Sequence, residues 1–132
     1  MADLAGGIHH VNISVSDLDR SAEWYTRLFG LKELRRLTDD VYRLRKILLV
    51  HPTGLLIGLT QHYENSGIPF EESLCGIDHV ALAVDGLDAL HHWEAQLDEL
   101  GVTRSEIKTT PLGSLITIRD PDNVQIELYA AG

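Results

Sequence analysis

The chain has 132 residues, of which 44% are hydrophobic and 23% are charged, as in one globular domain. Its 11 Lys and Arg against 20 Asp and Glu give a net charge of −9. This balance argues against nucleic acid and anionic membranes as partners, because both bind basic surfaces. A local cluster such as Arg43, Arg45 and Lys46 remains available for an anionic small molecule.

The sequence carries no sign of export or membrane insertion. No apolar run approaches the roughly 20 residues that cross a bilayer, and the first residues do not resemble a signal peptide. The single cysteine, Cys75, excludes an internal disulfide and fits a reducing compartment. We therefore expect a cytoplasmic protein.

The chain repeats itself with an offset of 69 residues. Segment 7–19 resembles segment 76–88, with Gly, Ile, His, Val, Leu and Asp recurring at matching places. Farther along, Trp24 matches Trp93 with the same offset. A constant offset along both halves is a poor fit to chance similarity, so the chain contains two copies of one module.

The repeat predicts a single domain over 1–132 that is built from two modules, 7–61 and 77–129. Residues 62–76 between them are polar, acidic and interrupted by Gly and Pro, which is typical of a linker. We expect a pseudo-twofold axis between the modules. A site should therefore lie where equivalent positions of the two modules converge.

The first module begins with apolar and polar residues in alternation, which predicts a strand over 11–15. A helix follows over 18–29, because its apolar residues fall on one face. Asp17 or Asp19 would cap its start, and Gly30 would end it. Three strand-like runs come next, at 31–38, 41–50 and 54–61.

The second module follows the same order. It predicts a strand over 77–84 and a helix over 87–100 that ends at Gly101. Three further strands are expected at 102–109, 114–119 and 124–129. The predicted class is α+β, with two tandem βαβββ modules that each form a curled mixed sheet with one helix.

Three residues with metal-ligand chemistry occupy related positions. His10 and His79 are 69 residues apart (79 − 10), and each lies on the first strand of its module, opposite to the flanking Val residues. Glu127 lies on the last strand, and its equivalent is Gly58. Each residue alone is more often structural, but together they form a 2-His-1-carboxylate set. We predict a site for Fe, Mn, Ni or Zn.

Residues that share a strand face with the predicted ligands are expected to line the site. His62 shares a face with Gly58 and is either a general base or the start of an exposed linker. Tyr129 shares a face with Glu127 and is a candidate proton donor, with a rim role as the alternative. The expected pocket residues, which packing alone would also explain, are Asn12, Ser14, Gly58, Thr60 and Ala81.

Segments 10–18, 24–31, 79–85 and 120–128 resemble the vicinal oxygen chelate superfamily, which includes glyoxalase I, ring-cleaving dioxygenases, and fosfomycin and bleomycin resistance proteins. The resemblance implies metal ligands at His10, His79 and Glu127. It implies a fourth ligand at the place of Gly58, which offers none. This departure argues against glyoxalase I and methylmalonyl-CoA epimerase activity.

The remaining His, His, Glu set resembles that of ring-cleaving dioxygenases and fosfomycin-modifying enzymes. A phosphonate substrate is disfavoured, because the loop over 109–114 contains no Lys or Arg. The sequence thus predicts a metal-dependent enzyme for a small molecule with vicinal oxygens, of dioxygenase, lyase or isomerase type. The alternative is a metal-free protein that sequesters a drug or metabolite, as bleomycin resistance proteins do. The resemblance also implies a homodimer.

Overall fold

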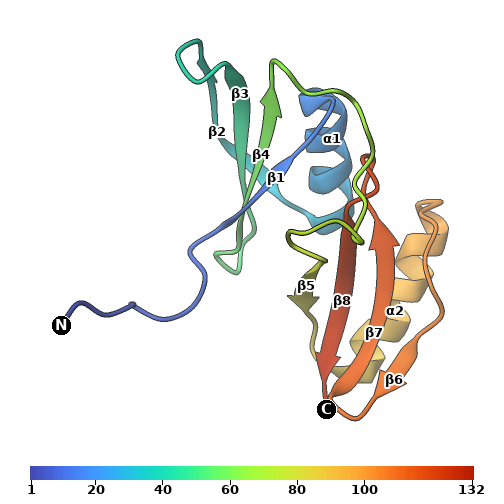
Figure 1. The fold of residues 1–132 in the computed structure, drawn as a ribbon. Coiled ribbons are helices and arrows are strands. Elements are labelled where there is room, and N and C mark those ends of the chain that lie inside the picture. The colour runs from blue at the N-terminus through green and yellow to red at the C-terminus, as the bar shows by residue number, and fades with distance from the viewer. The chain divides into compact units, whose positions relative to one another are not determined.

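The computed structural model describes all residues, 1–132. The chain divides into two compact units, Met1–Gly67 and Ile68–Gly132. Each unit contains one four-stranded mixed sheet and one helix (Figure 1), so the predicted α+β fold of two βαβββ modules is confirmed. Neither helix has the length and apolar character that crossing a membrane requires.

The sheet of the first unit has the order β1-β4-β3-β2. The first strand runs parallel to the fourth, and the other neighbours are antiparallel. The helix packs on β3 and β4. The elements are β1 (Val11–Ser14), α1 (Leu18–Phe29), β2 (Lys32–Asp39), β3 (Leu44–Val50) and β4 (Leu56–His62).

The two ends of α1 are fixed by local chemistry. Asp17 accepts a hydrogen bond from the backbone N–H of Arg20 at 3.1 Å, so it is the N-cap. Gly30 ends the helix with a φ of 68°, a conformation that favours glycine. Between them the apolar face of α1 packs on the sheet, and the apolar residues of this unit with no exposed surface are Val15, Tyr25, Ile47, Leu49 and Leu59.

The sheet of the second unit repeats this topology in the order β5-β8-β7-β6. Again the first strand runs parallel to the last, and the helix packs on the two final strands. The elements are β5 (Val80–Ala83), α2 (Gly86–Glu99), β6 (Lys108–Thr110), β7 (Gly113–Arg119) and β8 (Gln125–Ala131).

The predicted strand over 102–109 is wrong in extent, because only Lys108–Thr110 forms β6. Arg104 makes an isolated bridge to Ile118. The Ser105 hydroxyl then accepts a hydrogen bond from the N–H of Thr117 at 2.9 Å. A side chain thus takes the place that a strand carbonyl would have, and the ladder is interrupted.

The predicted strand over 41–50 also begins late, at Leu44. The Asp39 carboxylate accepts hydrogen bonds from the N–H groups of Val41 and Tyr42, both at 2.9 Å. Arg43 then adopts a φ of 57°. These residues form a turn between β2 and β3 instead of extending β3.

The strand registers of the two sheets match the repeat. In the first unit Asn12 pairs with Gly58 and Ser14 pairs with Thr60. In the second unit Ala81 pairs with Glu127 and Ala83 pairs with Tyr129. Since side chains alternate between the two faces of a sheet, these residues point away from the helix side, where the core lies.

Candidate metal centre

His79 and Glu127 are brought together on the second sheet. His79 directly precedes β5, and Glu127 lies on β8, opposite Ala81. The His79 Nε2 atom lies 3.3 Å from the Glu127 Oε2 atom. The His79 side chain is 38% exposed and that of Glu127 is 16% exposed, so the pair is open to a ligand on one side.

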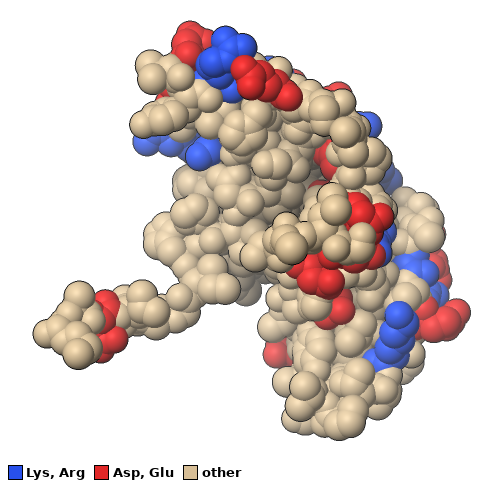
Figure 2. Space-filling view, viewed as in Figure 1, with Lys and Arg blue, Asp and Glu red and all other residues tan.

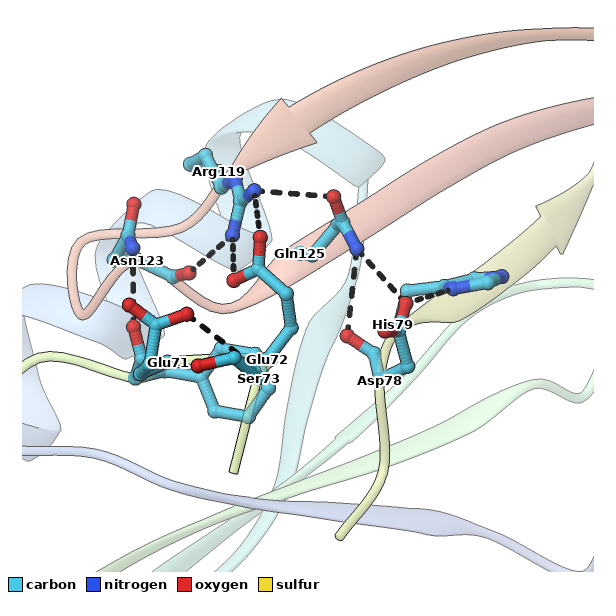
Figure 3. A network of polar contacts seen from close by, with 9 residues as sticks. Glu71, Glu72, Ser73, Asp78, His79, Arg119, Asn123 and Gln125 are labelled. Atoms are coloured by element: carbon cyan, nitrogen blue, oxygen red, sulfur yellow. Dashed lines mark hydrogen bonds and ion pairs between the residues drawn. The ribbon is translucent and has the colours of Figure 1, made fainter. Parts of the chain in front are cut away.

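The other side of the His79 ring is held by Asp78. The His79 Nδ1 atom lies 2.7 Å from the Asp78 Oδ1 atom (Figure 3). An ionised carboxylate only accepts hydrogen bonds, so this contact suits a proton on Nδ1. In a neutral imidazole, Nε2 then presents its lone pair toward the Glu127 carboxylate.

Two acceptor atoms that face each other in this way suit a shared cation. Zinc-type bonds to His and carboxylate ligands measure roughly 2.0–2.2 Å, which puts neighbouring ligand atoms on one tetrahedral ion about 3.3–3.6 Å apart. The distance of 3.3 Å between His79 Nε2 and Glu127 Oε2 fits this spacing. The pair therefore has the chemistry and the geometry of two ligands of one divalent metal.

A polar network continues behind Asp78 (Figure 3). Gln125 Nε2 donates to Asp78 Oδ1 at 3.0 Å, and Arg119 donates to Gln125 Oε1 at 3.1 Å. Arg119 also donates to both carboxylate oxygens of Glu72, at 3.0 and 2.8 Å. These hydrogen bonds lower the pKa of Glu72 from its ordinary value to about 2. A chain of hydrogen bonds therefore runs from Glu72 to His79.

The sequence prediction missed this supporting network. Two signals were available: Asp78 is the neighbour of His79 in the chain, and Gln125 lies two residues before Glu127 and thus on the same face of β8. No comparable signal pointed to Glu72, because residues 62–76 read as a linker.

His10 lies in the first unit, directly before β1, as His79 lies before β5. Its surroundings differ from those of His79. The His10 Nδ1 atom lies 2.9 Å from the Nδ1 atom of His9, so one ring donates and the other accepts. His9 occupies the position that is equivalent to Asp78 (78 − 69), and the first module therefore offers no carboxylate behind its histidine.

The space beside Gly58 is filled by a side chain from the neighbouring strand. A Cβ atom on Gly58 would lie 2.6 Å from the Nδ2 atom of Asn12, so the Asn12 amide covers the glycine. The buried Thr60 hydroxyl donates to Asn12 Oδ1 at 2.6 Å, which leaves Nδ2 over Gly58. The second module has the reverse pattern, with small Ala81 beside Glu127. In each module a polar side chain thus stands beside a small residue on the paired strand. In the first module the polar residue is on the first strand, and in the second module it is on the last strand.

The remaining predicted residues lie on the same faces but make fewer contacts. Ser14 is exposed at the end of β1, and His62 is exposed at the end of β4, two residues after Thr60. Tyr129 is half-buried, and its ring lies 3.0 Å from where a Cβ on Gly113 would be. No group of three or more His, Cys, Asp or Glu side chains is arranged to hold a metal. Of the three predicted ligands, the structure brings two close together in the second unit, His79 and Glu127.

The predicted basic cluster on β3 is divided in the structure. Arg43 lies over the Tyr63 ring at 5.5 Å and 3.6 Å from Glu64. Arg45 donates to Gln61, and Lys46 points to the opposite face of β3. Figure 2 shows acidic and basic side chains side by side around the β2–β3 turn, so these residues do not form one cationic surface.

Comparison with known proteins places this fold in one family. Residues 7–128 match the Glyoxalase/Bleomycin resistance protein/Dioxygenase superfamily. The putative ring-cleaving dioxygenase MhqA of Bacillus subtilis is 24% identical over 94% of the chain. The chain spans 40% of the length of that relative.

Two solved structures are similar. A glyoxylase/bleomycin resistance protein/dioxygenase domain from Frankia sp. EAN1pec is 31% identical, with a TM-score of 0.88 over 98% of this chain and 94% of that one. The fosfomycin resistance protein FosX from Listeria monocytogenes, solved with Mn(II) and sulfate, has the same fold, with 21% identity and a TM-score of 0.68 over 98% of this chain and 95% of that one. Since the family match covers nearly the whole chain, this protein belongs to the glyoxalase/bleomycin resistance/dioxygenase superfamily.

Proposed function

We propose that the chain is a metal-dependent enzyme for a small molecule that chelates a divalent metal through two vicinal oxygens. The reaction would be of the dioxygenase, lyase or isomerase type. The observation that carries the proposal is the close approach of two side chains of metal-ligand type, with His79 Nε2 and Glu127 Oε2 3.3 Å apart.

His79 and Glu127 would hold a divalent metal of the Fe, Mn, Ni or Zn type, which acts as a Lewis acid when bound. We propose His10 as the third ligand, because the repeat makes it the equivalent of His79. The FosX structure with Mn(II) supports a divalent metal in this fold. Small-molecule chemistry fits the dioxygenase relative.

The first module would supply polar contacts to the substrate. Asn12 presents its Nδ2 donor above Gly58 because Thr60 holds its Oδ1. An amide donates a hydrogen bond to a substrate oxygen but does not accept a proton as a carboxylate does. We therefore propose His62 or Tyr129 for proton transfer; they lie on β4 and β8, two residues after Thr60 and Glu127. Ser14 and Ala81 would line the pocket without taking part in the chemistry.

The test is the metal content of the purified protein, measured by mass spectrometry without a histidine tag or chelators, beside a His79→Ala variant. We expect near-stoichiometric metal in the wild type and its loss in the variant. A matched control is His92→Ala, which removes an exposed imidazole from α2 of the same unit and should leave the metal content unchanged.

The absence of metal after anaerobic reconstitution with Fe, Mn, Ni and Zn would overturn the proposal. The protein would then be examined as a metal-free binding protein. A screen of cationic and aromatic ligands suits that outcome, because the net charge is −9 and a surplus of acidic residues favours cationic ligands.

A further inference from the structure

We propose that Asp78 is a positioning residue, which fixes the His79 ring with Nδ1 protonated and Nε2 free, and that Gln125 and Arg119 hold Asp78 in place. As far as metal affinity is concerned, this inference rests on the proposed function. The selection of the ring tautomer does not, because it depends only on contacts within the second unit.

Asp78 Oδ1 and His79 Nδ1 make a short contact, at 2.7 Å. An imidazole that is free in water exchanges its proton between both nitrogens. Carboxylates face both nitrogens of His79, Asp78 at Nδ1 and Glu127 at Nε2, and the Asp78 contact is the shorter, at 2.7 against 3.3 Å. Asp78 therefore favours the form with the proton on Nδ1. Outer partners of this kind orient metal-binding histidines and raise the basicity of the free nitrogen.

The Asp78 side chain is held by hydrogen bonds although it is 61% exposed. Gln125 Nε2 donates to Asp78 Oδ1 at 3.0 Å, and its distance to the Asp78 carbonyl oxygen is 3.5 Å. The Gln125 amide is oriented in turn by Arg119, which donates to its Oε1 atom at 3.1 Å. The orientation matters, because a reversed amide would bring its oxygen against the Asp78 carboxylate (Figure 3).

The first module lacks this network. The positions equivalent to Asp78, Arg119 and Gln125 are occupied by His9, Val50 and Leu56, which cannot build the same chain. The module fold is duplicated, yet only the second copy carries the network. The network is therefore not a requirement of the fold, and it coincides with the histidine that lies between two carboxylates, His79.

Two measurements on the full-length, tag-free chain test the inference. The tautomer of His79 in the metal-free protein is read from imidazole ¹⁵N NMR, with signals assigned by their loss in His79→Gln. The affinity for Zn(II), used here as the probe, is measured by competition with a chromophoric chelator. We expect the Nδ1–H form of His79 in the wild type, because Asp78 lies closer to the ring than Glu127 does, and a shift toward the Nε2–H form in Asp78→Ala, where only Glu127 remains. Zn(II) affinity should be about 10–100-fold weaker in the variant.

Conservative and control variants separate positioning from folding. Asp78→Asn keeps an acceptor oxygen for Nδ1–H, so it should restore the wild-type tautomer. Gln125→Leu should give a smaller loss than Asp78→Ala, since Asp78 keeps its own bond to His79. Glu99→Ala removes an exposed carboxylate at the end of α2 and should change neither readout.

The outcomes distinguish this inference from the proposed function. Tautomer selection that Asp78→Ala abolishes, in a protein that binds no Zn(II), would support the positioning role and overturn the metal-dependent function. Zn(II) binding and a His79 tautomer that are both unaffected by Asp78→Ala would overturn the positioning role and leave the metal site intact.

Discussion

Gly58 is the residue where the two modules differ most in chemistry, and its lack of a side chain has a measurable consequence. A Cβ at this position would lie 2.6 Å from Asn12 Nδ2, closer than real Cβ contacts. In Gly58→Ala the Asn12 amide must move, and its hydrogen bond from Thr60 is strained or lost. Because Asn12 is exposed and its amide can move, we expect a loss of about 0.5–1.5 kcal/mol in the free energy of unfolding, the contribution of one hydrogen bond, measured by urea denaturation.

The double variant Asn12→Ala/Gly58→Ala isolates the cause. Removing the Asn12 amide removes the obstacle, so the alanine at position 58 should cost less in the Asn12→Ala background than in the wild type. Contacting residues show such non-additivity, whereas distant ones do not. Additive free energies in this cycle would contradict the packing of Asn12 over Gly58.

For single residues, the sequence predicted the strand and the face on which a residue lies better than it predicted the contacts of its side chain. The strand alternation and the repeat placed His79 and Glu127 on one face, and in the structure His79 Nε2 lies 3.3 Å from Glu127 Oε2. The Asn12 amide over Gly58 was not predicted, because a side-chain orientation depends on a neighbour such as Thr60 on another strand. Asp78 was missed for the same reason: its role appears only when Gln125 is placed beside it.

The two helices begin differently, and this difference predicts different sensitivities. Asp17 caps α1 with a side-chain hydrogen bond to the N–H of Arg20, whereas Asp85 at the start of α2 makes no such bond. Asp17→Ala should therefore lower the free energy of unfolding by about 0.5–2 kcal/mol. Asp85→Ala is the matched control and should cost clearly less. Equal losses, measured by thermal or urea unfolding, would contradict the assignment of the cap.

The segment after Gly67 is attached to the second sheet by an ion pair that predicts a response to acid. Glu72 has an ordinary pKa of 4.5, which Arg119 lowers to about 2 in the folded chain. A carboxyl whose pKa is lower in the folded than in the unfolded state stabilises the fold above the unfolded value, and this contribution is lost as the pH falls through the folded value. Attachment should therefore be complete above pH 4.5 and be lost near pH 2.

The amide N–H of Phe70 reports this attachment, because it donates to the carbonyl oxygen of Asp122 at 2.8 Å. Its NMR shift should titrate with a midpoint near that of Glu72, and Glu72→Gln should abolish the step. Circular dichroism at each pH separates this local change from global unfolding. A Glu72 carboxyl that titrates near 4.5 would show that the ion pair does not form in solution.

Element type was predictable where a periodic pattern was long, and boundaries were not. The apolar face of α1 and its terminal Gly30 gave that helix closely. The strand expected over 102–109 shrank to three residues because the Ser105 hydroxyl replaces a ladder carbonyl. The turn before Leu44 depends likewise on the Asp39 side chain. Both misses come from short polar side chains that bond to the backbone.

For the whole molecule, the repeat was the strongest signal in the sequence. Matched residues 69 apart predicted two modules with the same topology, and both sheets have the strand order that this requires. A duplicated fold does not by itself duplicate chemistry. The side chains at equivalent positions diverged, as His9 and Asp78 show, and the second module alone holds a histidine between two carboxylates.

Exposed apolar residues beside the first strand of each module predict how the protein assembles. Ile8 and Ile77 are equivalent residues that precede β1 and β5, and they are 83% and 73% exposed. Both strands lie at the edge of their sheets, and exposed edges beside apolar residues favour pairing with another surface. We therefore expect a homodimer with a mass of about 29 kDa (2 × 14.7 kDa) by light scattering. Ile77→Asp should yield monomers, whereas Val41→Asp, 86% exposed in the β2–β3 turn, should not. A monomeric wild type, or an Ile77→Asp variant that remains dimeric, would contradict pairing through these edges.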